Sequence, residues 1–442
     1  MTGLIVDNFA GGGGASTGIE AALGRPIDYA INHDAEAIAM HRANHPQTHH
    51  LNSSVWDVNP RRLVAGRSVD LGWFSPDCTF HSKARGGKPF RDRNVARRRR
   101  GLAWLIPYWM QSVRPRVVML ENVEEFADWG PLLPDGKICP QRRGMTFRRW
   151  HRQIENLGYR IDMRELRACD YGAPTTRKRL FVIARCDGEE IVFPEATHGR
   201  SAQPMRTAAE CIDWSIPCPS IFERNRPLAE ATMRRVARGV MRYVVNDPRP
   251  FIVGGAAPFI TEHANASNQR NMPAGEPLRT ICANVKGGHF ALVAAFLAKH
   301  YGGNEGPGWP LGSPISTITT VDHHALVQAF LVKFYGNERD GCRVDEPMHT
   351  VTTKDRFGLV TVHGEPYRIV DIGMRMLTPR ELYRAQGFPE SYIIDRGLMD
   401  DGGSVPLTKT AQVRMCGNSV APAVAEALVR ANLVQQSMRA AA

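Results

Sequence analysis

The sequence has no long apolar run, no signal-like start and no close cysteine pair, and each absence removes a class of protein. The longest apolar stretches, such as Phe290–Ala298, fall well short of the ~18 residues of a membrane span. The N-terminus lacks the basic start and apolar core of a signal peptide. The nine cysteines are scattered without C-x-x-C spacing, which argues against a zinc site or a disulfide framework. We therefore expect a cytoplasmic protein with reduced thiols, no membrane segment and no bound metal.

Positive charge, in contrast, is abundant. The 442-residue chain has a formal net charge of +12 and a pI near 9.5, and its 43% hydrophobic and 23% charged content suits two or three soluble domains. Arginine fills six of the ten positions from 91 to 100. Such clustering favours a polyanionic partner, because Lys and Arg that neutralise phosphates release counterions. A generally basic protein, with a solvated helix face at 97–100, is the alternative.

Apolar strands alternate with helical segments over the first 190 residues. The pattern predicts strands at 3–10, 27–32, 69–74, 116–122 and 179–186, and helices at 15–24, 35–46 and, despite Pro107, 101–113. Two later helices are predicted, one with capping-box spacing at Thr378 and Glu381 and one that starts at Pro422. The alternation predicts an α/β fold with a Rossmann-like, doubly wound and mostly parallel sheet, whose ligands lie at the carboxyl ends of its strands.

An internal repeat marks the later part of the chain, which is punctuated by Pro and Gly from about residue 190. Three segments align at Pro277, Pro314 and Pro347, with spacings of 37 and 33 residues. Their Thr, Ile and Val content predicts a β-rich module of three similar units at about 259–360. We expect one domain at 1–189 that resumes at 371–442, and a second domain at 190–370. Apolar positions shared by the repeats must be core, whereas exposed positions that differ could contact a partner.

The stretch DNFAGGGGASTG follows a predicted strand and opens a helix. Gly11 and Gly13 fit a dinucleotide-binding G-x-G-x-x-G pattern, but Ser16 stands in the third place. Four consecutive glycines let a ligand approach the backbone closely, and a tight strand-to-helix turn explains them equally well. If a nucleotide-like cofactor binds, Asp57 could bond an adenine amino group, and Asn32 or Asp34 could meet ribose hydroxyls.

Polar residues gather at three strand ends, where a parallel sheet would bring them to one edge. Cys78 follows one strand, Glu121 ends the next, and APTTRKR begins the last. With these, the motifs DNFAGGGGASTG, SPDC, ENV, RMLTPRELYRAQGFP and GNSVAP occur in the order found in the cytosine carbon-5 DNA methyltransferase family. The chain resembles this family over residues 3–185 and 371–431. The resemblance implies a class I methyltransferase domain, with a β-rich target-recognition domain in the segment between.

The resemblance also implies a covalent mechanism. The Cys78 thiolate would add to position 6 of cytosine and so make position 5 nucleophilic toward a sulfonium methyl group. Glu121 would protonate or hydrogen-bond ring nitrogen 3, while Arg179, and less directly Arg177, would hold the carbonyl oxygen of the base. The implied cofactor is S-adenosylmethionine. Its implied contacts are Phe9, Ala10, Gly11, Gly13, Asn32, Asp34, Asp57, Val58, Asn418 and Val420.

The implied substrate is a cytosine flipped out of a specific double-stranded DNA sequence. The family places a lid over the DNA at the positions that correspond to 82–100. Expected DNA contacts are Ser82, Lys83, Arg85, Lys88, Arg91 and Arg93, with His323, His324 and Arg356 in the repeats. The reaction would serve restriction–modification, phage self-protection or epigenetic marking in a bacterial or phage-infected cell. We expect a monomer, and a cognate endonuclease encoded nearby is left open.

Four positions depart from the family pattern. Asp77 and Thr79 flank Cys78, where the family has proline and glutamine, and a neighbouring carboxylate raises the pKa of a thiol unless it points away or is paired. The acidic ribose ligand of the family falls at Asn32, so cofactor affinity would be weaker unless Asp34 substitutes. Thr175 replaces the usual glutamine in APTTRKR, which would weaken a structural hydrogen bond rather than the chemistry.

Two other functions remain as alternatives. An RNA cytosine-5 methyltransferase has the same core, but it would not need about 180 residues of recognition region. A non-catalytic DNA-binding protein on a decayed scaffold would not be expected to retain Cys78, Glu121, Arg179 and Asn418 together. The histidines of the segment 41–50 have no cysteine or carboxylate framework around them, which argues against a metal site there.

Overall fold

The computed structural model describes residues 3–81, 92–263, 270–283, 289–299, 359–362 and 365–434. The chain divides into two compact units. The first consists of Met1–Cys211, Pro277–Val285 and Thr378–Ala442, and the second of Ile212–Glu276 and Lys286–Leu377. The expected domain bounds were 189/190 and 370/371, so the first unit extends further along the chain and also takes in a short piece of the first repeat. The second and third repeats lie outside the described residues, apart from a strand at their end.

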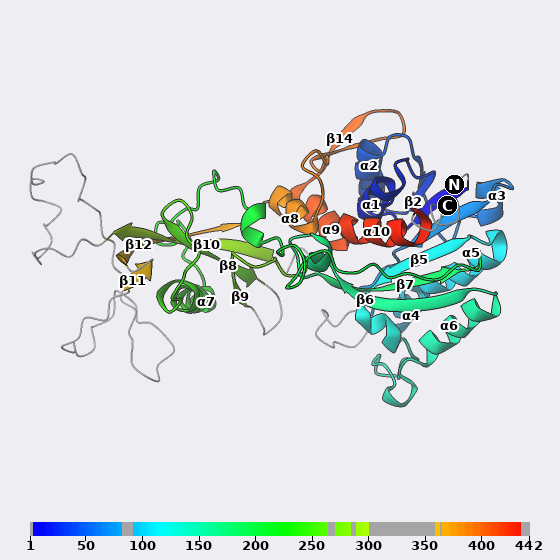
Figure 1. Ribbon diagram of the computed structural model, residues 1–442, viewed down its shortest axis with the longest axis horizontal. Helices are drawn as coiled ribbons and strands as arrows, with labels where there is room; N and C mark the ends of the chain where they lie inside the picture. The colour runs from blue at the N-terminus through cyan, green and yellow to red at the C-terminus, as the bar shows by residue number, and fades with distance from the viewer. Residues whose placement is uncertain are drawn as a thin grey trace, which may run out of the picture. The chain divides into compact units, whose positions relative to one another are not determined.

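The first unit contains a seven-stranded sheet (Figure 1) with the order β3-β2-β1-β4-β5-β7-β6. Its strands are β1 (Leu4–Asn8), β2 (Tyr29–Asn32), β3 (His49–Asn52), β4 (Val69–Phe74), β5 (Val117–Asn122), β6 (Arg160–Arg167) and β7 (Lys178–Arg185). Strands β1 to β5 pair in parallel, whereas β7 runs antiparallel to both β5 and β6. The predicted mostly parallel, doubly wound sheet is therefore confirmed. Two of its strands, β3 and β6, were not predicted.

Alternating side chains of the central strands build a core on each face of this sheet. Leu4 and Val6 point into a cluster with Trp109 and Trp150, whereas Ile5 between them packs with α1 and α10 residues such as Leu428. Accordingly, α5 (Leu105–Val113) and α6 (Met145–Asn156) cover one face, and α1 (Gly14–Leu23) and α10 (Pro422–Val429) cover the other.

Local sequence signals explain where the helices begin and end. Asp34 caps α2 (Ala35–Asn44), and Thr378 and Glu381 form the predicted capping box of α8 (Pro379–Gln386). Pro107 is tolerated because it lies in the first turn of α5, where its missing N–H is not needed. The remaining elements of this unit include α3 (Pro60–Val64), α4 (Arg93–Arg100), β13 (Arg396–Leu398), β14 (Ser404–Pro406) and α9 (Lys409–Asn418).

The second unit is built on an antiparallel sheet with the order β11-β12-β10-β8-β9. Its strands are β8 (Ala256–His263), β9 (Asn271–Pro273), β10 (His289–Lys299), β11 (Leu359–Val362) and β12 (Glu365–Met376), and α7 (Glu230–Val240) belongs to the same unit. Val236 and Val240 of α7 pack with Phe259, Val293 and Ile372 of the sheet. The prediction of a separate β-rich second domain is confirmed for this part of the chain.

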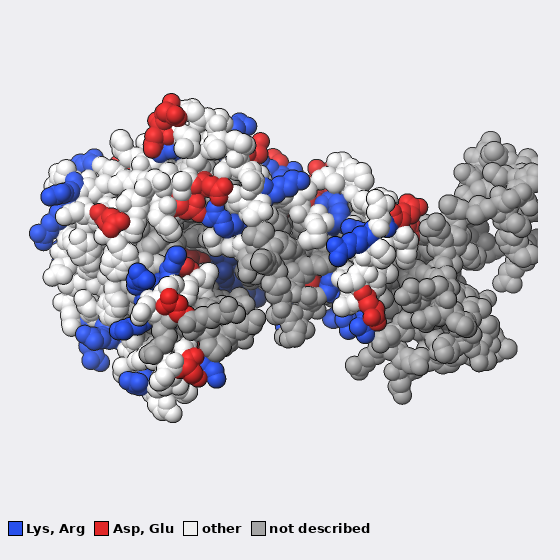
Figure 2. Space-filling model, turned by 180° about the vertical axis from the view of Figure 1, so that it is seen from behind, with Lys and Arg blue, Asp and Glu red and all other residues white. Residues whose placement is uncertain are grey.

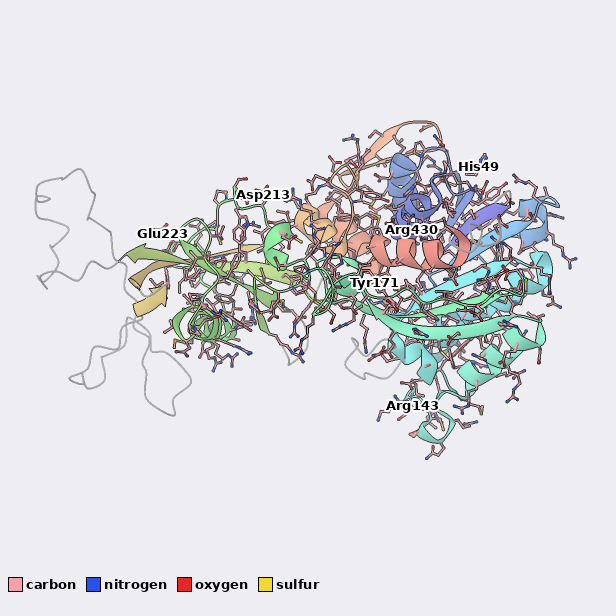
Figure 3. All side chains as sticks on the ribbon, in the orientation of Figure 1. His49, Arg143, Tyr171, Asp213, Glu223 and Arg430 are labelled. Atoms are coloured by element: carbon pink, nitrogen blue, oxygen red, sulfur yellow. The ribbon has the colours of Figure 1, made fainter. Side chains whose placement is uncertain are left out.

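The periphery of the first unit carries charged and polar side chains. His49, Arg143 and Arg430 are exposed there (Figure 3), and Asp213 and Glu223 belong to the second unit. Among the helices that the structure describes, none combines the length and apolarity required to cross a bilayer.

Because α1 and α10 pack closely at Gly18, a larger residue there should destabilise the protein. A Cβ added to Gly18 would lie 2.3 Å from the Pro422 carbonyl oxygen and 2.8 Å from the Glu426 nitrogen, which are backbone atoms that cannot swing away. Gly18→Ala should therefore lower the free energy of unfolding by about 2 kcal/mol, measured by urea denaturation. Gly24→Ala, at a positive φ but with open space around it, is the control and should cost about 1 kcal/mol. A Gly18→Ala protein as stable as the unmodified one would contradict this packing.

Candidate active site

The antiparallel direction of β7 brings the candidate catalytic residues together. Glu121 is next to last in β5, and Cys78 lies four residues beyond the end of β4. Arg179 lies near the start of β7 and Arg177 directly precedes that strand; because β7 is antiparallel to β5, its start lies beside the carboxyl end of β5, where Asn122 pairs with Leu180. The expected convergence at one edge of the sheet therefore occurs, but a parallel β7 would have placed both arginines at the opposite edge.

A buried carboxylate stands between two guanidinium groups at this edge. The Glu121 Oε1 atom lies 3.2 Å from Nε of Arg179 and 3.8 Å from Nη2 of Arg177, and both Glu121 and Arg177 are almost fully buried. Arg177 is held in place by a hydrogen bond from Nη1 to the Gly417 carbonyl at 3.0 Å, and burial, together with Arg179, lowers its pKa to about 10.

Three polar atoms of this group have unused hydrogen-bonding capacity. Within the described chain, Glu121 Oε1, Arg177 Nε and Arg179 Nε are buried without an aligned hydrogen bond. Buried polar atoms normally find partners, so their concentration at one point indicates a place where a ligand supplies them. Guanidinium groups donate to a carbonyl oxygen, and a carboxyl group in its protonated form donates to a ring nitrogen, so this group of side chains matches a ligand that presents both.

The Cys78 thiol is strongly influenced by this cluster. Burial raises the pKa of Cys78, and the negative charge of Glu121 raises it further, whereas Arg179 and Arg177 act in the opposite direction. The thiol is therefore predominantly protonated at neutral pH in this state. Nucleophilic attack requires the thiolate. A change that weakens the effect of Glu121 or strengthens that of the two arginines would lower the pKa of Cys78 and so activate the thiol.

The Asp77 carboxylate is paired, so it has little effect on the pKa of the Cys78 thiol. Its Oδ1 atom accepts hydrogen bonds from the backbone N–H of Thr79 at 2.8 Å and from the Thr79 hydroxyl at 2.5 Å, and Oδ2 pairs with Arg99 at 3.3 Å. Its charge makes the smallest of the contributions identified for the Cys78 pKa. The two departures from the family motif thus cooperate, because Asp77 and Thr79 together shape the turn that carries Cys78.

Thr175 joins the catalytic edge to a piece of the first repeat. Its hydroxyl donates to the Arg279 carbonyl at 3.2 Å and accepts from the Arg177 N–H at 3.3 Å, while the Thr176 N–H donates to the Leu278 carbonyl at 2.7 Å. The sequence did not predict this role for 277–285, because the repeat pattern assigned that segment to the other domain.

The two interpretations of the glycine-rich turn, a tight strand-to-helix turn and close approach of a ligand, apply to different glycines. A Cβ on Gly14 would lie 1.9 Å from the Ser419 hydroxyl and 2.2 Å from the Val420 carbonyl, so this glycine is required by packing. Gly11 differs, since its φ is +54° and its Cβ would meet only the Phe9 carbonyl at 3.8 Å. The open backbone at Gly11, with Asp57 and Asn418 exposed, fits an adenosyl cofactor approached through backbone and polar groups.

The candidate ribose ligands are partly engaged within the protein. The Asn32 Oδ1 atom accepts from the Asp34 N–H at 2.9 Å, and the Asp34 carboxylate caps α2 and pairs with Arg414. Although burial acts against it, bonding to Arg414 lowers the pKa of Asp34 and keeps it ionised. Arg414 was not singled out from sequence, and no local pattern identifies it. The remaining predicted cofactor contacts, Ala10, Val58 and Val420, are buried apolar residues whose contact with a cofactor stays a prediction.

The expected DNA contacts are only partly visible. Residues 82–91, His323, His324 and Arg356 lie outside the described residues, and Arg93 begins α4. Arg97, Arg98 and Arg99 are exposed on α4, whereas Arg100 is buried and donates to the Gly130 carbonyl at 3.1 Å. The arginine run is thus not entirely a solvated face. Lys and Arg also stand in several separate groups on the face drawn in Figure 2, so positive charge is not confined to this run.

The histidines of 41–50 do not form a metal site in the part of the chain that the structure describes. No group of three or more His, Cys, Asp or Glu side chains there has a metal-binding arrangement. His41 and His50 are bonded to each other instead, through Nδ1 and Nε2 at 2.8 Å.

Comparisons with known proteins agree with this arrangement of residues. A family model described as C-5 cytosine-specific DNA methylase matches residues 4–216 and 316–433. Type II methyltransferase M.AgeI of Thalassovita gelatinovora is 30% identical over 200 residues, which cover 44% of this chain and 42% of that protein. Type II methyltransferase M1.HphI of Haemophilus parahaemolyticus is 28% identical over 202 residues, covering 45% and 50%. The match thus spans about half the length of these relatives. Dnmt2 methyltransferase of S. pombe shares the fold, with a TM-score of 0.50, 13% identity and 99% of both chains covered.

The charges around Cys78 predict the direction in which its pKa changes when one of them is removed. Glu121→Gln removes the negative charge that raises the thiol pKa and leaves both arginines, so the pKa of Cys78 should fall. The measurement is the rate of Cys78 alkylation by iodoacetamide against pH, followed by mass spectrometry of its peptide. Asp77→Asn is the matched control and should shift the profile less, because Arg99 already pairs with that carboxylate. An unchanged or raised pKa in Glu121→Gln would contradict this electrostatic arrangement.

Proposed function

The chain belongs to the C-5 cytosine-specific DNA methylase family, and from this we propose that it methylates carbon 5 of a cytosine flipped out of a specific double-stranded DNA sequence. The observation that carries the proposal is the group of buried polar atoms on Glu121, Arg177 and Arg179, beside the Cys78 thiol, that form ion pairs but no aligned hydrogen bond among the described residues. Cytosine offers a ring nitrogen and a carbonyl oxygen that match a carboxyl group and a guanidinium group.

Each catalytic residue has a separate part in the proposed reaction. Cys78, as the thiolate, forms a bond to carbon 6 of the ring, and the electron pair displaced toward ring nitrogen 3 takes a proton from the carboxylic acid form of Glu121. Arg179 holds the carbonyl oxygen, while Arg177, bonded to Gly417, keeps Glu121 and Arg179 in place. Once carbon 5 carries the methyl group, nitrogen 3 returns its proton to Glu121. Loss of the proton at position 5 to solvent water then expels the Cys78 sulfur as a thiolate and restores the aromatic ring.

S-adenosylmethionine, when bound, would supply the electrophilic methyl group. Backbone atoms from Phe9 to Gly13 would hold it closely, because Gly11 leaves that side of the turn open. Asp57 and Asn418, both exposed, would provide side-chain hydrogen bonds. Of the two ribose candidates, Asn32 has its amide NH₂ available, whereas the Asp34 carboxylate is shared with Arg414.

DNA would be held chiefly through its phosphates. The helix α4, with its exposed arginines, follows the segment 82–91, which contains four further Lys or Arg residues, and such groups bind DNA by releasing counterions. The second unit would supply base readout. The type II methyltransferases among the relatives favour a restriction–modification role in a bacterial cytoplasm, beside a cognate endonuclease, with this chain acting as a monomer.

The Cys78→Ser variant tests the proposed chemistry. A serine hydroxyl is a much weaker nucleophile, so methyl transfer from labelled S-adenosylmethionine to a mixed-sequence duplex should fall by about a thousandfold or more, while duplex binding remains. Cys186→Ser is the control and should retain activity. Like Cys78, Cys186 is a partly buried free cysteine, and its Sγ lies near the Pro115 carbonyl.

Bisulfite sequencing of the product identifies the methylated cytosine context. Full turnover by Cys78→Ser would contradict the covalent mechanism, and methylation of folded RNA in preference to duplex DNA would contradict the proposed substrate.

A further inference from the structure

The glycine-rich turn, defined here as Phe9–Gly14, adopts a conformation that its own hydrogen bonds do not secure. Phe9 has a φ of 64°, a region that a residue with a side chain rarely occupies, and Gly11 and Gly13 also have positive φ. Within the turn, the Gly13 N–H donates to the Ala10 carbonyl at 3.1 Å. Strained backbone of this kind persists only where surrounding groups determine it.

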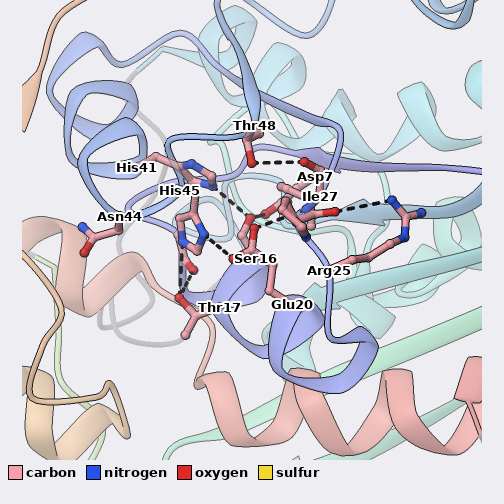
Figure 4. Close-up of polar contacts among 12 residues, drawn as sticks. Asp7, Ser16, Thr17, Glu20, Arg25, Ile27, His41, Asn44, His45 and Thr48 are labelled. Carbon is pink, nitrogen blue, oxygen red and sulfur yellow. Dashed lines mark hydrogen bonds and ion pairs between the residues drawn. The ribbon is translucent and has the colours of Figure 1, made fainter. Parts of the chain in front are cut away.

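One hydrogen-bonded chain fixes the strand that leads into the turn (Figure 4). The Ser16 hydroxyl of α1 donates to the buried Asp7 carboxylate of β1 at 2.6 Å. The same hydroxyl oxygen lies 2.9 Å from Nε2 of His41 on α2, whose Nδ1 lies 2.8 Å from Nε2 of His50 on β3. Asp7, Ser16 and His41 have no exposed surface. This chain thus joins β1, α1, α2 and β3 next to the start of the turn.

The direction of the hydrogen bonds in this chain follows from the number of available protons. When Asp7 is ionised, Ser16 donates to it, the Ser16 oxygen accepts from Nε2–H of His41, and Nδ1 of a neutral His41 accepts from His50. Burial raises the pKa of Asp7 to about 7, and in its protonated form Asp7 can donate to Ser16, which reverses the direction of the chain without breaking it. Burial, followed by the neighbouring histidines, lowers the pKa of His41 well below its usual value, and burial lowers the pKa of His50 to about 4, so both rings are neutral at physiological pH.

A second chain reaches the turn itself. Nδ1 of the buried His45 lies 2.8 Å from Oε2 of Glu20, and its Nε2 lies 3.4 Å from both the Tyr392 hydroxyl and the Thr17 hydroxyl. Tyr392 donates to the Gly12 carbonyl at 2.5 Å, and Thr17 donates to the Gly13 carbonyl at 2.8 Å. Two successive carbonyls of the turn are therefore held from outside.

These groups also fill the space that the missing side chain of Gly13 leaves. A Cβ on Gly13 would lie 2.2 Å from the Tyr392 hydroxyl and 2.9 Å from Nε2 of His45. Gly13 therefore does not face a ligand on that side but rests on the histidine and the tyrosine. The turn thus contacts His45 and Tyr392 at Gly13, whereas the described residues leave space for a ligand at Gly11.

We propose that Ser16, His41, His45 and Tyr392 are positioning residues that hold the glycine-rich turn in the conformation that binds the adenosyl cofactor. His45 and Tyr392 contact the turn, and Ser16 and His41 hold the end of the strand that leads into it. Because they act through the turn and not on the reacting atoms, they should set cofactor affinity and leave the chemical step unchanged. This proposal rests on the proposed function for the identity of the cofactor.

The test uses single-atom deletions that preserve packing. Tyr392→Phe removes the donor to Gly12, and Ser16→Ala removes the hydroxyl that joins Asp7 to His41. Tyr159→Phe is the matched control, because the Tyr159 hydroxyl is also buried and donates to a carbonyl, that of Pro115, at 2.7 Å in the same unit. Binding of S-adenosylhomocysteine to the full chain is measured by titration calorimetry, and the melting temperature of each variant is recorded.

Tyr392→Phe and Ser16→Ala should each weaken S-adenosylhomocysteine binding about tenfold, while Tyr159→Phe binds normally with a similar fall in melting temperature. In methylation assays the KM for S-adenosylmethionine should rise with kcat unchanged. Equal binding by all three variants, when the unmodified protein binds, would overturn the positioning role alone. If the unmodified protein bound no S-adenosylhomocysteine, the proposed cofactor would be wrong and this proposal with it.

Discussion

The burial of Glu121 between two arginines is the interaction on which the rest of the site depends. An unpaired charge at this depth would destabilise the fold, and Arg177 and Arg179 supply the opposite charge that offsets this cost. The same three side chains set the electrostatic surroundings of Cys78. Their arrangement requires an antiparallel β7, because only then do residues just before and at the start of that strand lie at the carboxyl end of β5.

Close backbone packing links the two sides of the first unit. Gly14 and Gly18 of α1 allow Ser419, Val420 and Pro422 to approach, and Gly417 just before them accepts the hydrogen bond from Arg177. One short segment thus contacts both α1 and the group of Glu121, Arg177 and Arg179.

The sequence predicted the central strands and the order of the motifs because long apolar runs and glycine-rich turns have clear local signatures. It missed β3 and β6, whose polar residues carry little hydrophobic signal, as both lie at the edges of the sheet. Strand direction and the pairing of Asp77 with Arg99 depend on tertiary contacts. Nor could periodicity show that Leu278 and Arg279 leave the repeat to bond at the catalytic edge, because that contact joins residues over a hundred positions apart.

The most direct measurement of the central claim is covalent trapping on DNA that contains 5-fluorocytosine. Fluorine at position 5 blocks the final elimination, so a thiol that adds to carbon 6 remains attached after methyl transfer. With S-adenosylmethionine and a mixed-sequence fluorinated duplex, we predict a complex that survives denaturing electrophoresis, with the DNA attached to the peptide that contains Cys78. A protein that binds and methylates the ordinary duplex but forms no such adduct, or forms it through another cysteine, would contradict the role of Cys78.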